Sequence, residues 1–193
     1  MRHAQPDHSW DNDRTRPLSD EGIIDSEHVC KVFENIRLDY VISSPYIRSV
    51  KTIEKCANLH NLEIHFDERY REREKGLNGN NKEMFRKRWE DFNYHEDGGE
   101  SLEMVQKRNI EALTELLSTH QGENILLGTH GTALSTILNY YDKSYSCENF
   151  LPIIDYMPYI IRLDFEGFSC IGKEELLIIK KEYKGNHSLM LFS

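Results

Sequence analysis

Residues 40–57 of this 193-residue chain read YVISSPYIRSVKTIEKCA. The β-branched run at 40–42 predicts a short buried strand that stops at the turn Ser43-Ser44-Pro45. Proline fits the first turn of a helix, and the apolar residues that follow recur at helical spacing, namely Val50, Ile53 and Ala57. A strand that passes through a polar turn into a helix is the repeating unit of α/β folds.

The same unit recurs later in the chain. Residues 124–128 (NILLG) have the pattern of a buried strand, and a helix is predicted over 132–140 after the turn Thr129-His130-Gly131. Further strands are expected at 62–66, 159–165 and 176–181, with Gly167 near a turn between the last two.

Helical patterns fill most of the intervals between these strands. One helix is predicted over 19–36 with Ser19 as its N-cap, a second over 101–119, and a polar helix carrying Trp89 and Phe92 between them. Strands that alternate with helices predict a three-layer α/β/α sandwich with a mostly parallel central sheet. We expect residues 1–193 to form one domain.

The composition restricts the possible classes of function. The formal net charge is −9, so the chain is a poor candidate for binding nucleic acid, which needs clustered Lys and Arg. There is no apolar run long enough to predict a membrane-spanning helix, and the polar start lacks the apolar centre of a signal peptide. The four cysteines are far apart in sequence, which favours neither a zinc site nor a disulfide framework and predicts a reduced, cytoplasmic setting.

Three polar clusters follow predicted strands, at residues 43–48, 67–76 and 129–131. Ligands of open α/β sheets bind at the carboxyl ends of the strands, so these clusters are expected to share one site. Arg2 and His3 would join them if the residues before His3 also form a strand.

The residue types in these clusters suit phosphoryl transfer. Near pH 7 an imidazole such as that of His3 is a neutral nucleophile, and the guanidinium fork of Arg48 matches the oxygens of a phosphoryl group. A carboxyl group can protonate the leaving oxygen and then activate water, and Glu72 is the candidate, with Glu68 and Glu74 in the same charged loop. His130 lies between a strand and a helix, where backbone N–H groups can also meet an anion.

Six segments in this order resemble motifs of the histidine phosphatase superfamily, whose fold is called phosphoglycerate mutase-like. RHA at 2–4 is similar to its Arg-His-Gly signature, with Ala4 in the glycine position. The other five are PLSDEG at 17–22, SSPYIRSVKT at 43–52, REREKG at 71–76, GGES at 98–101 and GTHG at 128–131. They resemble the Leu-(Ser/Thr)-x-x-Gly, Ser-Ser-Pro-x-x-Arg-x-x-x-Thr, Leu-x-Glu-x-x-x-Gly, Gly-Glu-Ser and Ser-His-Gly elements of the family.

The resemblance implies a phosphoric monoester hydrolase of the histidine acid phosphatase type, acting on a small phosphorylated metabolite. His3 would attack phosphorus and become a phosphohistidine, while Arg2, Arg48 and His130 hold the phosphoryl oxygens. The register of the loop motif aligns Glu72 with the family's proton donor. The family needs no metal or other cofactor for this chemistry.

Departures from the family pattern leave alternatives open. Family members carry a hydrophobic strand before Arg-His in the centre of the sheet, but only Met1 precedes Arg2 here. We therefore expect the family's first strand to be missing before residue 1, with little to hold His3 in place. For this reason, a non-catalytic phosphate-binding module is one alternative function. A cofactor-dependent phosphoglycerate mutase, primed by 2,3-bisphosphoglycerate, is the other. Ser9 in place of the mutases' Asn, and the short interval between Glu72 and His130, favour a phosphatase.

Several segments do not allow one interpretation from sequence. Residues 80–97 and the loop after Asp11 are expected to shape the substrate pocket, and His8, Trp10 and Asp11 either line it or belong to a plain surface loop. The Tyr-rich segment 140–159 is either part of the core or the interface of a homodimer.

Overall fold

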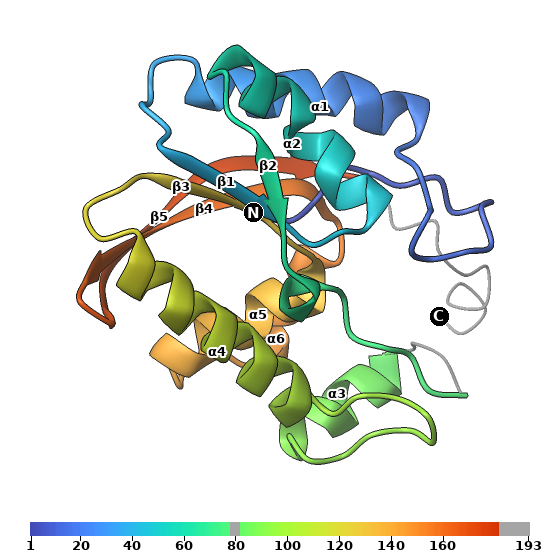
Figure 1. Cartoon of the computed structure of the whole chain (residues 1–193). Helices are drawn as coiled ribbons and strands as arrows, with labels where there is room; N and C mark the ends of the chain where they lie inside the picture. Colours follow the sequence, from blue (N-terminus) through green and yellow to red (C-terminus); the bar gives the residue numbers. More distant parts are fainter. Residues whose placement is uncertain (78–81, 182–193) are drawn as a thin grey trace.

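The fold places a β-sheet between two layers of helices (Figure 1). The computed structural model describes residues 1–77 and 82–181. Helices α1 (Asp20–Phe33) and α2 (Ile47–Leu59) cover one face of the sheet. Helices α4 (Leu102–Thr119), α5 (Gly131–Tyr141) and α6 (Cys147–Ile153) cover the other, and α3 (Lys82–Glu90) lies at one end. The predicted three-layer α/β/α architecture is therefore confirmed.

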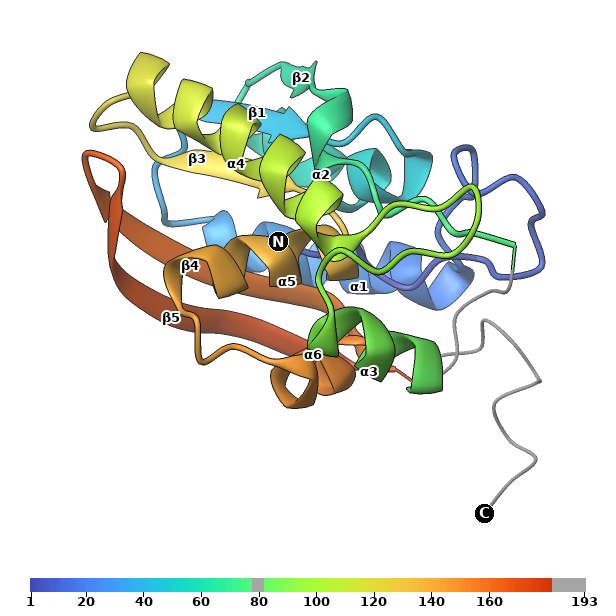
Figure 2. The same ribbon diagram turned by 90° about the horizontal axis from the view of Figure 1, so that it is seen from below.

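The sheet consists of a parallel part and an antiparallel part. Strands β1 (Tyr40–Ser43), β2 (Ile64–Phe66) and β3 (Ile125–Gly128) pair in parallel in the order β2-β1-β3. Strands β4 (Tyr156–Glu166) and β5 (Ser169–Lys180) form an antiparallel pair that turns at Gly167. The expected parallel pairing thus holds for the first three strands, and the last two form a hairpin on the β3 side (Figure 2).

Alternation along β1 explains why helices pack on both faces. Val41 belongs to a core cluster with Val29 of α1 and Ile53 of α2. Its neighbour Ile42 belongs to a different cluster, which includes residues of α4 and α5. Successive side chains of a strand point to opposite faces, so one β-branched pair supplies both cores.

The helix ends follow from their capping residues. The Ser19 hydroxyl accepts a hydrogen bond from the amide of Gly22, and the Ser101 hydroxyl accepts one from Met104. Such caps satisfy amides that have no partner within the helix. The Ser19 cap stands where the sequence predicts it, but α1 ends at Phe33 rather than at residue 36.

Several boundaries differ from prediction. Strand β2 is shorter than expected, β4 and β5 are longer, and Phe92 lies beyond the end of α3. The short helix α6 was not predicted, because its proline and mixed composition mask a helical period in so few residues. Within the Tyr-rich segment, Tyr145 and Tyr159 are buried in the core, whereas Tyr140 is exposed.

Residues 1–3 link the two parts of the sheet. The amide of Arg2 donates to the carbonyl of Tyr159 (2.8 Å), and the amide of His3 donates to that of Thr129 (3.2 Å). The amide of Thr129 in turn donates to Met1 (2.9 Å). The expectation that little would hold His3 is therefore wrong, because its own amide bonds to the residue after β3 and the preceding residue, Arg2, bonds to β4.

Candidate functional site

His3 has a defined protonation state in this structure. Its side chain is 5% exposed, and its Nδ1 lies 2.7 Å from the carbonyl oxygen of Ala4. Its Nε2 accepts a hydrogen bond from Nε of Arg48 at 3.1 Å. A carbonyl can only accept and a guanidinium can only donate, so the ring is neutral with its proton on Nδ1. The lone pair of Nε2 is directed at Arg48.

The surroundings keep this imidazole uncharged. Burial lowers the pKa of His3 well below its usual value, and the charges of Arg48 and Arg2 lower it further. Burial also lowers the pKa of His130, with Arg48 and His3 as the next causes. Desolvation and like charge both disfavour the protonated ring, so the two histidines are neutral well into the acid range.

The segments that resemble family motifs hold the loop after His3. The amide of Ala4 donates to the hydroxyl of Thr52 (2.9 Å), which donates to the carbonyl of Arg48 (2.7 Å). A side chain on Gly22 would place its Cβ 2.1 Å from the carbonyl oxygen of Gln5, so only glycine lets α1 approach this loop. Thr52 and Gly22 are far from His3 in the sequence, but both contact the loop that follows it.

Arg48 is held by an acidic residue as well as by His3. Its guanidinium donates to the backbone carbonyl of Asp13 and to its carboxylate (3.2 Å). Asp13 also accepts from Arg16 (2.6 Å). Burial would raise the pKa of Asp13, but the charges of Arg48, Lys75 and Arg16 outweigh it and hold that pKa below its usual value. An anionic ligand of Arg48 must therefore compete with this carboxylate.

His130 is the N-cap residue of α5 and faces the same site. Its ring centre is 5.2 Å from that of His3, and its Nε2 lies 2.8 Å from the hydroxyl of Ser44. Its Nδ1 is buried and has no hydrogen-bond partner among the described residues. A Cβ on Gly131 would lie 3.2 Å from Nε of Arg2, so glycine lets this guanidinium lie against the start of α5. His130 and Arg2 thus both lie beside the start of α5, close to His3.

Glu72 is the carboxylate of the charged loop that reaches the site. One of its oxygens accepts from the amide of Arg73 (2.8 Å) and the other from the amide of Thr132 in the first turn of α5 (3.3 Å). Glu68 pairs with Arg14 at the surface, and the exposed Glu74 forms an ion pair with Arg71. Neither lines the pocket, so the geometry favours Glu72 among the three.

Arg108 fixes the loop that carries Glu72. Its guanidinium donates to the carbonyls of Arg69 (2.6 Å), Arg71 (2.9 Å) and Glu72 (3.2 Å), and it pairs with Glu100 (3.0 Å). Sequence reasoning missed this role, because nothing in the sequence distinguishes Arg108 from a solvated helix residue. It also missed Asp13. The GGES element, which contains Glu100, was the one available signal.

These residues surround a pocket of about 80 Å³, a volume that suits a phosphate-sized group rather than a large ligand. Its charged side includes four of the five residues named from sequence, namely Arg2, His3, Arg48 and Glu72. His130 does not line the pocket itself, but its ring contacts His3 and its chain neighbours Gly131 and Thr132 line it. Its apolar side consists of Phe85, Phe150, Ile154 and Met157.

The structure also sorts the residues whose position was open. His8 lines the pocket, whereas Trp10 and Asp11 do not. Residues 80–97 contribute Phe85, although residues 80 and 81 lie outside the described part of the chain. Among the described residues, no group of three or more His, Cys, Asp or Glu side chains is placed to hold a metal ion, and no helix is long and apolar enough to cross a membrane.

Comparison with known proteins gives one family. Residues 1–157 match the model of the histidine phosphatase superfamily (branch 1). Among proteins of curated function, no sequence matches the chain.

Solved structures of similar fold include three at low sequence identity. YhfR from Bacillus stearothermophilus has a TM-score of 0.73 and 22% identity, over 96% of this chain and 94% of that one. A mycobacterial glucosyl-3-phosphoglycerate phosphatase with VO3 has a TM-score of 0.69 and 17% identity, over 93% and 97%. A mutant phosphoserine phosphatase from Entamoeba histolytica, in complex with phosphoserine, has a TM-score of 0.63 and 21% identity, over 78% and 81%. At these identities the likeness shows the fold.

The buried neutral histidines predict an acid-sensitive fold. Because folding lowers the pKa of His3 and of His130, the unfolded chain binds more protons below pH about 6.5. The stability that these neutral rings contribute is therefore fully present above that pH and is lost as the pH falls, by about 1 kcal/mol per histidine between pH 7.5 and 5.5. Urea unfolding of His130→Gln should show that much less loss than the native chain. The exposed His28→Gln is the control, and an equal loss in all three proteins would contradict this assignment.

Asp13→Asn should tighten the binding of inorganic phosphate. Removing the carboxylate charge leaves Arg48 with a weaker competitor for an incoming anion. We expect the dissociation constant to fall about two- to tenfold, the range of a partly exposed ion pair. Calorimetry at fixed salt measures it, with Asp11→Asn in the same loop as the matched control. Weaker binding in Asp13→Asn would mean instead that Asp13 orients Arg48 for the ligand.

Proposed function

The chain belongs to the histidine phosphatase superfamily, and we propose that it is a metal-independent phosphomonoesterase that hydrolyses a small phosphorylated metabolite through a phosphohistidine on His3. The observation that carries this proposal is the neutral His3 ring, fixed through Nδ1 on Ala4, with Nε2 facing Arg48 and with His130 beside it. An imidazole in this tautomer is ready to act as a nucleophile.

In the first step, the lone pair of His3 Nε2 attacks phosphorus and the bond to the leaving oxygen breaks. Nε2 must first lose its hydrogen bond from Arg48, whose guanidinium then binds the phosphoryl oxygens in place of the Asp13 carboxylate. Arg2 and His130 hold the remaining oxygens. The positive charge for the transition state thus comes from side chains that are already in place.

Glu72 moves the protons in both steps. As an acid it protonates the leaving alkoxide, and as a carboxylate it takes a proton from the water that attacks the phosphohistidine. The P–N bond then breaks and returns the neutral His3 ring. The amides of Arg73 and Thr132 hold its two oxygens at the edge of the pocket.

The size of the pocket favours a small substrate, and the lowered pKa of His3 favours activity at acid pH. Its charged side accepts one phosphate, and its apolar wall offers contact to a modest organic group. Two structural neighbours are phosphatases of small substrates, glucosyl-3-phosphoglycerate and phosphoserine. Because the pKa of His3 is held well below its usual value, the nucleophile stays unprotonated at acid pH, as the histidine acid phosphatase type requires.

The first test is hydrolysis of p-nitrophenyl phosphate near pH 6 in the presence of EDTA. His3→Ala should lose at least about a thousandfold in kcat/KM, because the proposed covalent intermediate forms on Nε2 of His3. His28→Ala, on the exposed face of α1, should keep the native rate. Native activity that EDTA abolishes, or that survives in His3→Ala, would contradict the mechanism. An inactive native chain that still binds phosphate would favour the non-catalytic alternative.

The effect of Glu72→Gln on kcat/KM should depend on the leaving group of the substrate. An alkyl phosphate needs a proton on its leaving oxygen, so kcat/KM should fall by about 10²- to 10⁴-fold. With p-nitrophenyl phosphate the loss in kcat/KM should be much smaller, since that leaving group departs as an anion. Glu74→Gln is the matched control two residues away in the same loop. Equal losses on both substrates would show that Glu72 has a structural role and does not donate the proton.

A further inference from the structure

The pocket of the candidate active site contains more positive charge than the proposed phosphoryl transfer uses. Arg16, Arg73 and Lys75 line the same pocket as His3, but none of them has a role in that reaction. A basic side chain can bind a further anionic group of a substrate only if no acid of the protein already holds it. The partners of these three side chains therefore decide which of them is available to a ligand.

Two of the three basic side chains are already paired. The guanidinium of Arg16 donates to the carboxylate of Asp13 (2.6 Å), and that of Arg73 pairs with the buried carboxylate of Glu96 (3.2 Å). The third, Lys75, is exposed and makes no hydrogen bond or ion pair within the described part of the chain. Its ammonium group can therefore bind a ligand without releasing a partner in the protein.

The backbone around Lys75 is held in place, although its side chain is exposed. The carbonyl of Glu74 accepts a hydrogen bond from the amide of Glu100 (3.1 Å). On the other side, a Cβ on Gly76 would lie 2.3 Å from the Cβ of Glu96, so glycine lets the two segments pack closely. Lys75 lies between these two contacts, which fix where its side chain starts relative to the pocket.

The charge of Lys75 acts on other groups that line the pocket. Burial lowers the pKa of His8 to about 4, and the charges of Arg16 and Lys75 are the next causes. Burial would raise the pKa of Asp13, but the charges of Arg48 and Lys75 are the largest of those that hold it below its usual value. Since His8 and Asp13 both line the pocket, Lys75 contributes to a positive potential there.

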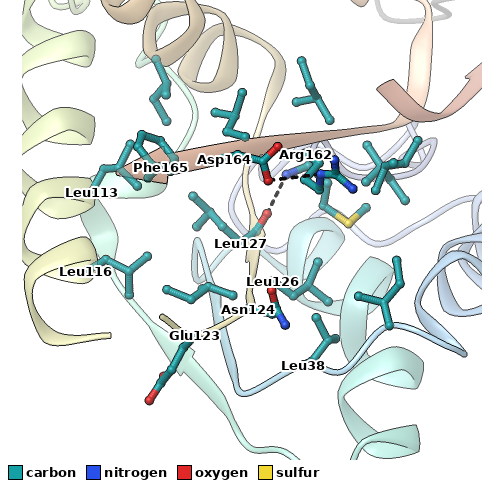
Figure 3. A pocket seen from close by; sticks show the side chains of 18 of the residues that line it. Leu38, Leu113, Leu116, Glu123, Asn124, Leu126, Leu127, Arg162, Asp164 and Phe165 are labelled. Carbon is teal, nitrogen blue, oxygen red and sulfur yellow. Dashed lines mark hydrogen bonds and ion pairs between the residues drawn. The ribbon is translucent and has the colours of Figure 1, made fainter. Parts of the chain in front are cut away.

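A second cavity, of about 230 Å³, offers no such cation. Aliphatic side chains of β3, β4 and α4 form most of its lining (Figure 3). Figure 3 shows Arg162, the one basic side chain among its described lining residues, beside Asp164. Arg162 pairs with Asp164 (3.3 Å) and with Glu174 (3.0 Å), so its charge is already balanced. Of these two cavities, the pocket at His3 is therefore the one suited to a ligand with an additional negative charge.

We propose that Lys75 binds a carboxylate, so that the substrate is the phosphomonoester of a small hydroxy acid. Arg2 and Arg48 balance the charge of a phosphoryl group. Asp13 keeps its contact with Arg16 through the oxygen that does not bind Arg48, which leaves one ammonium group for one carboxylate. A second phosphate would bring more negative charge than this single ammonium group balances. The inference rests on the proposed function and makes Lys75 a specificity-determining residue.

The experiment compares two phosphate esters that differ in one group. They are 3-phosphoglycerate and glycerol 3-phosphate, which has a hydroxymethyl group in place of the carboxylate. We expect the native chain to prefer 3-phosphoglycerate by about tenfold in kcat/KM, the effect of one charge-assisted hydrogen bond. Lys75→Gln should remove this preference, and Lys75→Glu should reverse it. Lys107→Gln removes an exposed lysine of α4, outside the active-site pocket, and should keep the native preference.

Calorimetric titration with the same two esters separates this inference from the proposed function. If the native chain hydrolyses neither ester but binds 3-phosphoglycerate about tenfold more tightly, and Lys75→Gln abolishes the difference, the proposed function is wrong and the carboxylate site stands. Hydrolysis of both esters with equal kcat/KM would support the proposed function and overturn the carboxylate site. The same preference in the native chain and in Lys75→Gln, or no binding of 3-phosphoglycerate to the native chain, would also overturn that site.

Discussion

The structure depends on the backbone junction at Arg2. The amides of the dipeptide Arg2-His3 donate hydrogen bonds to Tyr159 of β4 and to Thr129 at the end of β3, and so join a parallel sheet to an antiparallel pair. The same bonds place the imidazole of His3 between Arg48 and His130. Few hydrogen bonds support this arrangement, which means that the continuity of the sheet and the position of His3 depend on the same contacts. A change that loosens one must loosen the other.

The electrostatics of the site follow from how these residues are buried. Arginine stays charged in any environment, whereas imidazole gives up its proton when desolvated beside other cations. When the two residue types are buried together, arginine therefore stays charged and histidine stays neutral. Arg2 and Arg48 are cations, and His3 and His130 are neutral bases. The acidic composition of the whole chain has little effect on the electrostatic potential in the pocket, because the nearby charges dominate that potential.

Much of the site and of the fold could be predicted from sequence, for local reasons. Ser19 and Ser101 cap helices through contacts three residues away, and the strand-turn-helix units at Ser43 and Thr129 depend on short-range patterns. What could not be predicted depends on contacts between residues that are far apart in the sequence. Asp13 meets Arg48 across 35 residues, and Arg108 meets Glu72 across 36. The backbone hydrogen bonds that hold Arg2 and His3 were missed for the same reason, because their partners in and after β3 and β4 are far away in sequence.

The contact between Asp13 and Arg48 has a consequence for how affinities should be interpreted. The ligand-free site already contains an anion, which is part of the protein itself. Substrate binding is then an exchange of one anion for another, and the measured free energy is a difference between two ion pairs rather than the strength of one. In such an exchange the ligand takes the place of the Asp13 carboxylate on Arg48, so occupancy of the pocket and the contact between Asp13 and Arg48 are thermodynamically linked. Asp13 thus acts as an internal counter-ion of Arg48.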